Sequence, residues 1–234
     1  MLDKNLAILR RRFPLVLQRI LNRDQKESEQ LFYDDAQSPP KLLVKNDRAK
    51  FPVYGNRPGN RLVSDWFNLL RLKKEALYAL SGFGDGSHIR HFLKNTPGGT
   101  FLLVMECDAC LLRETFKRFD CSDILSHERF LLGTGTIDDD FFKDIQEAVM
   151  HKLADINSLI FSPLHCLNES YYDKARNEMI RQYLVVRPLM EVNLRTGVNL
   201  QENTLSNLVH MASSPDVGQL ADLFTKTPFI LVGA

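Results

Sequence analysis

A chain of 234 residues can form one large domain or two smaller ones, and its 44% hydrophobic and 25% charged residues are sufficient for a packed core. The 30 basic and 29 acidic residues nearly cancel, so the composition indicates neither a nucleic-acid partner nor an anionic membrane. No apolar run approaches the roughly 20 residues that a membrane helix needs. Charges near the N-terminus argue against a signal peptide, and the four cysteines fit a reducing compartment, so we expect a cytoplasmic protein.

Residues 1–62 are expected to hold a helix followed by a small antiparallel β-meander. Apolar residues recur at helical spacing over 3–22, and Pro14 predicts a break or kink because it cannot donate a backbone hydrogen bond. The β-rich runs LFYDD, KLLVK and FPVYG follow, separated by polar breaks that contain proline and glycine. This pattern is typical of a meander.

Residues 63–165 alternate between helical and strand-like segments, which predicts a Rossmann-like α/β domain. Strands that are apolar almost throughout indicate a mostly parallel sheet with helices on both faces. The expected helices are 64–77, 87–95, 109–119 and 138–153, and the expected strands are 77–83, 101–107, 129–134 and 159–164. Residues 166–226 then form a mostly helical segment, and 227–234 are expected to be the first strand of a following domain.

The stretch YALSGFGDGSHIRHF places a glycine-rich turn between a predicted strand and a predicted helix. Such a turn can bring backbone N–H groups close to a nucleotide or to S-adenosylmethionine. The ligand-binding candidates in this turn are Gly82, Gly84, Asp85 and Gly86. Glu106 ends the next strand, where an acidic residue can meet ribose hydroxyls. The third glycine comes early for a dinucleotide pattern, and Leu80 stands where methyltransferases usually carry an acid, so a tight turn without a ligand is the alternative.

Further candidates lie near the same predicted edge of the sheet. Gly133 and Gly135 sit where the third strand passes into a loop at this edge, and they either join the same crevice or serve as turn residues. A zinc site or, for the cysteines, a redox pair is a weaker alternative for His88, His91, Cys107 and Cys110. The acidic run 138–140 is interpreted as a helix cap. We assign no catalytic residue and no metal ligand.

Three stretches together resemble one family: YALSGFGDGSHIRHFL, FLLVMECDACLLRETFKRFD and NTLSNLVHMASSPDVGQLADLFTKTPFILVGA. They are similar to the motility accessory factor proteins, which are flagellin glycosyltransferases. The resemblance is most specific from Pro228 to Ala234, where the family's PxxxVGA strand leads into a Gly-Pro-Ser-Leu loop of the central domain. The resemblance implies that this chain is an N-terminal fragment or a natural truncation that largely lacks the central domain. In the family, that central domain is related to archaeal hydroxymethylpterin diphosphokinase-like proteins.

The resemblance also implies a function for the full-length protein. It would transfer a nonulosonic acid from a CMP-activated donor to Ser or Thr of flagellin, and no catalytic residue of the family maps onto this chain. We therefore expect a non-catalytic N-terminal domain that binds flagellin, orients the catalytic domain, or both, and that is inactive alone. The alternatives are a methyltransferase-like enzyme that binds S-adenosylmethionine and a purely structural module with a vestigial nucleotide fold.

Overall fold

The computed structural model describes residues 1–22, 31–36, 38–45, 49–55, 61–138, 141 and 155–213. The chain divides into two compact units, Met1–Arg187 and Pro188–Ala234. The predicted strand 227–234 lies outside the described residues, and so does the predicted helix 138–153 apart from Asp138 and Phe141.

The first unit contains both β-sheets. The described strands are β1 (Leu31–Asp34), β2 (Lys41–Lys45), β3 (Lys50–Pro52), β4 (Ala76–Ser81), β5 (Phe101–Glu106), β6 (Phe130–Thr134) and β7 (Asp155–Leu159). The described helices are α1 (Leu2–Arg12), α2 (Pro14–Leu21), α3 (Arg61–Asn68), α4 (Ser87–Asn95), α5 (Ala109–Arg118), α6 (Ser122–Leu125), α8 (Ser162–His165) and α9 (Glu169–Ser213). The boundary between the two units falls within α9.

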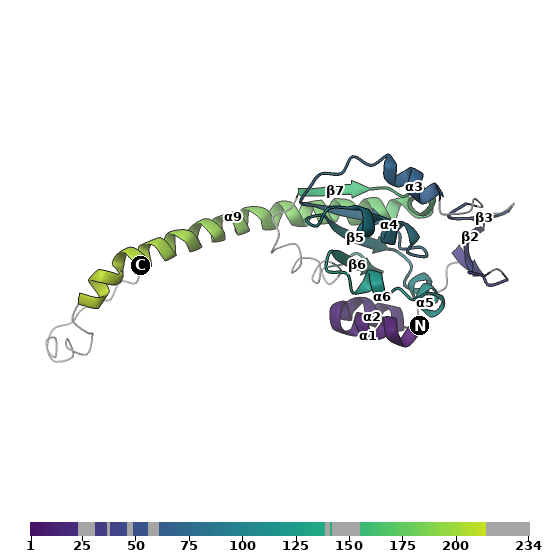
Figure 1. Ribbon diagram of the computed structural model, residues 1–234, viewed down its shortest axis with the longest axis horizontal. Helices are drawn as coiled ribbons and strands as arrows, with labels where there is room; N and C mark the ends of the chain where they lie inside the picture. Colours follow the sequence, from purple (N-terminus) through teal and green to yellow (C-terminus); the bar gives the residue numbers. More distant parts are fainter. Residues whose placement is uncertain are drawn as a thin grey trace. The chain divides into compact units, whose positions relative to one another are not determined.

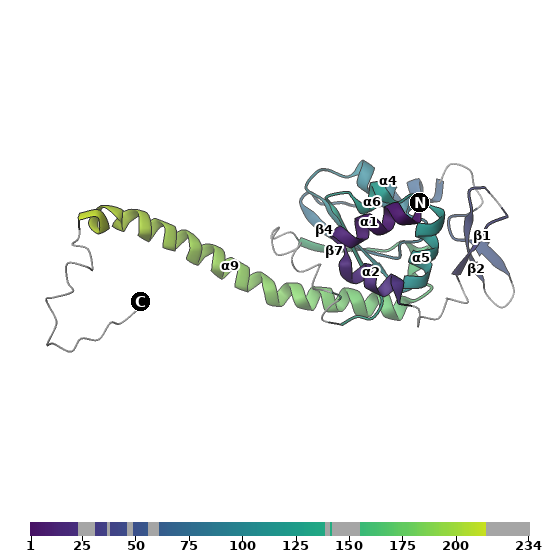
Figure 2. The same cartoon turned by 90° about the horizontal axis from the view of Figure 1, so that it is seen from below.

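The N-terminal helices belong to the same core as the α/β segment. The predicted break at Pro14 is confirmed: Phe13 leaves the helical conformation and Pro14 takes the first turn of α2, where its missing N–H is tolerated. Helix α1 contacts α5 and α6, and α2 contacts α5 and β6 (Figures 1 and 2). Leu9 and Ile20 are buried in these contacts.

The predicted β-meander is confirmed as a three-stranded antiparallel sheet in the order β1-β2-β3. Tyr33 of β1 lies opposite Leu42 of β2, and both side chains are buried in the same core as Val53, which follows β3. The meander therefore packs one face on the α/β segment.

Strands β4 to β7 form a four-stranded sheet in which every pairing is parallel, in the order β6-β5-β4-β7. With helices on its faces, this sheet makes the chain an α/β protein with a Rossmann-like core, as predicted. All six residues of β4 are buried, which explains the apolar run in the sequence.

Alternate residues of the parallel strands enter two different cores. On one face, Tyr78 and Leu80 join buried side chains of α1, α2, α4 and α5. On the other face, Ala79 and Met105 pack with Tyr172 from the first turn of α9. Residues one apart on a strand point to opposite faces, so both sides of the sheet are covered.

The predicted helix 64–77 is too long at its C-terminal end, because α3 ends at Asn68. The backbone N–H of Lys73 donates to the hydroxyl of Tyr78, and Glu75 adopts a positive φ of 56°. A left-handed residue directly before β4 is incompatible with a continuing helix. The apolar residues Leu70 and Leu72 pack on the core from a segment that is neither helix nor strand.

The predicted strand 159–164 is also wrong in its position, because β7 spans Asp155–Leu159 and α8 follows at Ser162–His165. Pro163 has no N–H for a strand ladder but suits the first turn of a helix. This shift places Leu164 and His165 beside the carboxyl end of the sheet, where both contribute to the candidate site.

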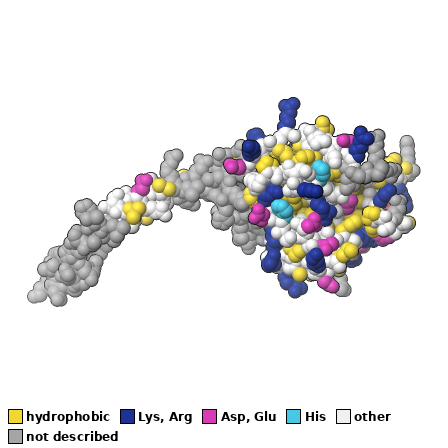
Figure 3. Space-filling view, in the orientation of Figure 1, with side chains coloured by type: hydrophobic (Ala, Val, Ile, Leu, Met, Phe, Trp, Pro, Cys, Tyr) yellow, Lys and Arg dark blue, Asp and Glu magenta, His cyan; other side chains and the backbone are white. Residues whose placement is uncertain are grey.

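Acidic and basic side chains intersperse over the described part of the face in Figure 3. That distribution agrees with the near-zero net charge of the sequence. Among the described helices, none combines the length and the apolar character that crossing a bilayer requires.

Candidate functional site

The strand order places a topological switch point between β4 and β7. From β4 the chain proceeds to β5 on one side, whereas β7 returns to pair with β4 on the other side. Ligands of open α/β sheets bind in the crevice at the carboxyl ends of the strands at such a point. The predicted glycine turn follows β4 directly, so it lies where a ligand is expected.

All three glycines of this turn adopt a left-handed backbone conformation. Gly82, Gly84 and Gly86 have φ values of +83°, +55° and +81°, in the left-handed region that favours glycine. The N–H of Gly82 donates to the carbonyl of Met105, and that of Gly86 donates to the carbonyl of Phe83. The turn is therefore a tightly bonded connection between β4 and α4.

Side chains of the protein itself occupy the space beside these glycines. A Cβ atom on Gly82 would stand 2.7 Å from the Cβ of Leu164, and one on Gly84 would overlap the hydroxyl of Tyr54. A Cβ on Gly86 would stand 2.8 Å from Cδ1 of Ile124. The glycines thus allow close approach of protein side chains, at positions where a dinucleotide fold admits the ligand's phosphates.

The backbone donors of the turn also have partners within the chain. The N–H of Phe83 donates to Oε2 of Glu106 over 2.7 Å, and the N–H of Asp85 donates to the hydroxyl of Tyr54 over 3.1 Å. The N–H of Ser87 donates to Oδ1 of Asp85 over 2.8 Å. An anion at the N-terminus of α4 would have to compete with these internal acceptors.

Glu106, predicted to meet a ribose, is directed at the backbone of its own chain. It is 1% exposed, and its Oε1 accepts from the N–H of Asp108 over 3.0 Å. Burial raises the pKa of this carboxyl group. The carbonyl oxygen of Glu106 accepts from the hydroxyl of Thr134 and from the N–H of Gly135. Glu106 therefore ties the glycine turn to the loop after β6.

The two glycines predicted to share the crevice are likewise covered by protein side chains. A Cβ on Gly133 would stand 2.8 Å from the ring of Phe141, and one on Gly135 would stand 3.2 Å from Cδ of Arg19. The hydroxyl of Tyr171 donates to the carbonyl of Gly135. The structure thus brings the predicted site residues to one edge of the sheet, where they contact one another and neighbouring side chains.

A buried histidine links the turn to the meander. The carbonyl of Gly82 can only accept, so Nε2 of His88, 3.2 Å away, carries the proton and Nδ1 accepts from the hydroxyl of Tyr54 over 3.0 Å. That leaves the Tyr54 oxygen to accept from the N–H of Asp85. The imidazole stacks on Phe161 with ring centroids 4.5 Å apart. Tyr54 and His88 together fix the conformation of the turn.

This geometry disfavours the zinc and redox alternatives. Both ring nitrogens of His88 have partners, so neither is available to a metal. Burial raises the pKa of Cys107, which disfavours the thiolate that metal binding and redox chemistry need. The side chain of Cys110 is buried. We interpret these residues as parts of the core.

The stability of the turn should depend on pH through His88. Burial lowers the pKa of His88 from 6.5 to about 3. The unfolded chain takes up a proton below pH 6.5 while the folded chain does not, so stability falls as the pH drops from 6.5 toward 3, by up to about 1.4 kcal/mol per pH unit. In His88→Gln this contribution should vanish. Urea unfolding of both proteins at pH 5 and pH 7 measures the difference, and an equal loss in the two proteins would contradict it.

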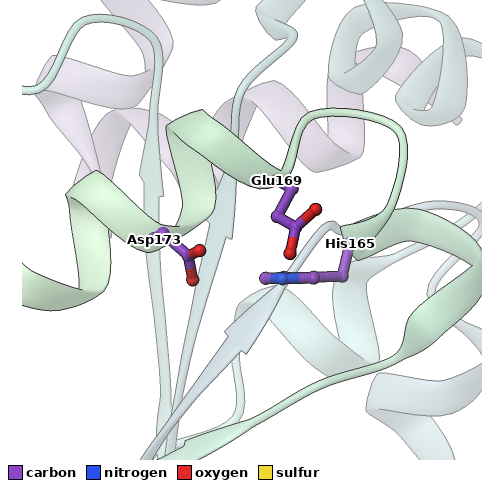
Figure 4. A group of neighbouring side chains, drawn as sticks. All are labelled: His165, Glu169 and Asp173. Atoms are coloured by element: carbon purple, nitrogen blue, oxygen red, sulfur yellow. The ribbon is translucent and has the colours of Figure 1, made fainter.

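A second group of polar side chains lies at the same switch point and was not predicted from the sequence. His165, Glu169 and Asp173 direct their polar ends toward one another (Figure 4), and their nearest candidate ligand atoms all lie within 4.8 Å of one another. Nδ1 of His165 lies 3.0 Å from the hydroxyl oxygen of Ser81, the last residue of β4. The three residues are spaced four apart in the sequence. Because the strand 159–164 was predicted in the wrong position, they were not recognised as a group.

A pocket of about 210 Å³ lies between the edge strand β1 and helix α5. Its lining combines apolar, acidic and basic side chains, among them Phe32, Glu114 and Arg118. Arg118 binds Glu114 and also pairs with Asp35 over 2.8 Å. The pocket therefore offers apolar surface beside a paired charge network.

Comparison of the chain with family models, with curated proteins and with solved structures finds no match.

Proposed function

We propose that this chain is a non-catalytic N-terminal module of a flagellin glycosyltransferase, and that it contacts the flagellin acceptor. The observation that carries the proposal is the filled switch point: Leu164, Tyr54 and Glu106 occupy the positions and the backbone donors that a nucleotide would use. A catalytic Rossmann domain keeps this crevice for its cofactor or donor. The resemblance to motility accessory factor proteins supplies the biological setting.

We propose that the acceptor contact lies at the pocket beside β1. An edge strand presents backbone groups that an extended peptide can pair with, and adjacent pockets then select its side chains. Strand β1 pairs with β2 on one side and lines the pocket together with α5. Phe32 is one of the residues that line the pocket, and the ammonium of Lys50 lies over its ring, 5.0 Å from the centroid.

Purified flagellin should bind the chain saturably in isothermal titration, and Phe32→Ser should weaken this binding at least about tenfold, the loss of one buried aromatic anchor. Phe51→Ser is the matched control, because Phe51 lies on β3, is 51% exposed and does not line the pocket. It should bind flagellin as the unmodified chain does.

The same mixture tests the lack of catalysis. Incubation of the chain with flagellin and a CMP-activated nonulosonic acid should add no sugar to flagellin, as judged by intact-protein mass spectrometry. Sugar transfer by this chain alone would contradict the non-catalytic assignment, and a lack of flagellin binding would remove the acceptor role.

A further inference from the structure

We propose that His165, Glu169 and Asp173 bind a divalent transition-metal cation such as Mn²⁺, Co²⁺ or Zn²⁺. The three side chains offer one imidazole nitrogen and two carboxylates, a mixed donor set that suits these ions better than the all-oxygen sets of Ca²⁺ and Mg²⁺. Their nearest candidate ligand atoms already lie within 4.8 Å of one another. The site lies at the same switch point as the glycine turn but uses none of its residues. It also shares no residue with the pocket beside β1, so it does not depend on the acceptor role.

His165 is held in the orientation that a metal ligand needs. The residue is only 6% exposed, its ring stacks on Tyr172 with centroids 5.7 Å apart, and its Nδ1 lies 3.0 Å from the Ser81 hydroxyl. Metal-binding histidines characteristically engage their second nitrogen in such a hydrogen bond, which fixes the ring and its tautomer. Nε2 has no hydrogen-bond partner among the described residues. The imidazole ring lies beside the carboxylate groups of Glu169 and Asp173 (Figure 4).

Helix α9 supplies both carboxylates from one face. Glu169 is its first residue and Asp173 stands one turn later, so their side chains are neighbours. Glu169 is exposed and makes no ion pair with the described residues, whereas Asp173 pairs through Oδ1 with Arg176 at 3.0 Å. A carboxylate in the first turn of a helix stabilises the helix dipole, and this role could account for Glu169 by itself. It does not explain why the side chains of His165 and Asp173 lie next to it.

The site needs a small contraction to close on an ion. Metal–ligand bonds of about 2.0–2.2 Å place neighbouring ligand atoms roughly 3–3.5 Å apart. Rotation of the exposed Glu169 side chain can bring its carboxylate nearer to His165 without moving the backbone. Three protein ligands leave further coordination positions open, which oxygen ligands or water can occupy.

Isothermal titration of the chain with MnCl₂ and with CoCl₂ tests the site. We expect one ion per chain, with the affinity lowered at least about tenfold by Glu169→Gln and by Asp173→Asn, because each removes a charged ligand. Both variants replace side chains that are not buried, so the fold is expected to survive, and thermal unfolding without metal checks this. Unchanged affinity in both variants, or no binding by the unmodified chain, would overturn the proposal.

Two control substitutions identify the ligands. Cys166→Ser removes an exposed thiol next to His165, and Glu178→Gln removes a carboxylate farther along α9 that pairs with Arg181. Both should bind metal as the unmodified chain does. Loss of binding in Cys166→Ser, or a thiolate charge-transfer band in the Co²⁺ spectrum, would assign the ion to the thiol and overturn the carboxylate site. Flagellin is absent from these titrations, so failure of the metal site and failure of the acceptor role remain distinguishable.

Discussion

Gly82→Ala is expected to lower the free energy of unfolding by about 3 kcal/mol, from left-handed backbone strain and from overpacking together. Its φ is +83°, and the new methyl group would meet the Cβ of Leu164 at 2.7 Å. A Cβ atom is fixed to the backbone, so Leu164 cannot rotate away. Urea unfolding without any ligand measures the loss.

Two other glycines separate the contributions to this loss. Gly55 has a φ of +72° and nothing within 4 Å of an added Cβ, so Gly55→Ala should cost only the strain, about 1–2 kcal/mol. Gly98 has open space and no positive φ, so Gly98→Ala should change stability by no more than about 0.5 kcal/mol. If Gly82→Ala costs no more than Gly55→Ala, the space beside the turn is not filled by Leu164.

The second large effect is expected at Glu106, because its carboxylate accepts from two backbone donors, one buried and one partly buried. Glu106→Ala would leave the N–H groups of Phe83 and Asp108 without this acceptor. Each unsatisfied buried donor costs about 1–3 kcal/mol, so we expect a loss of roughly 2–5 kcal/mol in the free energy of unfolding. Chemical denaturation at pH 7 provides the measurement.

Glu128→Ala is the matched control for this substitution. Glu128 is an exposed carboxylate of the same unit, and its removal should alter stability by less than about 0.5 kcal/mol. If Glu106→Ala differs from the unmodified chain by less than about 0.5 kcal/mol in stability, the carboxylate of Glu106 does not hold the turn. Glu106 would then again be a candidate ligand contact.

Local sequence signals predicted those elements whose boundaries are set by neighbouring residues. Helix α4 begins where predicted because the glycine turn precedes it, and it also ends where predicted. Helix α5 begins where predicted, directly after Asp108, whose side chain caps it. Strands β4 and β5 were also predicted, because each is a continuous apolar run in the sequence. Where a single residue overrode the pattern, as Pro163 does after β7, the prediction was wrong by several residues.

The occupants of the candidate site could not be predicted from the sequence. Tyr54 reaches the glycine turn from the meander and Leu164 reaches it from beyond β7, so the contact depends on tertiary structure. A glycine-rich turn has the same sequence whether it admits a phosphate or a leucine. The group of His165, Glu169 and Asp173 was missed because the position of α8 and the start of α9 had first to be known.

The most direct test of the filled switch point is an NMR titration that follows the backbone amides of Gly82, Gly84 and Gly86. CMP and S-adenosylmethionine would be added separately to the uniformly ¹⁵N-labelled chain. We expect no saturable change at these three amides, because Leu164 and Tyr54 already occupy the space beside them. Saturable shifts centred on the three glycines with either ligand would contradict it and would establish the turn as a binding site.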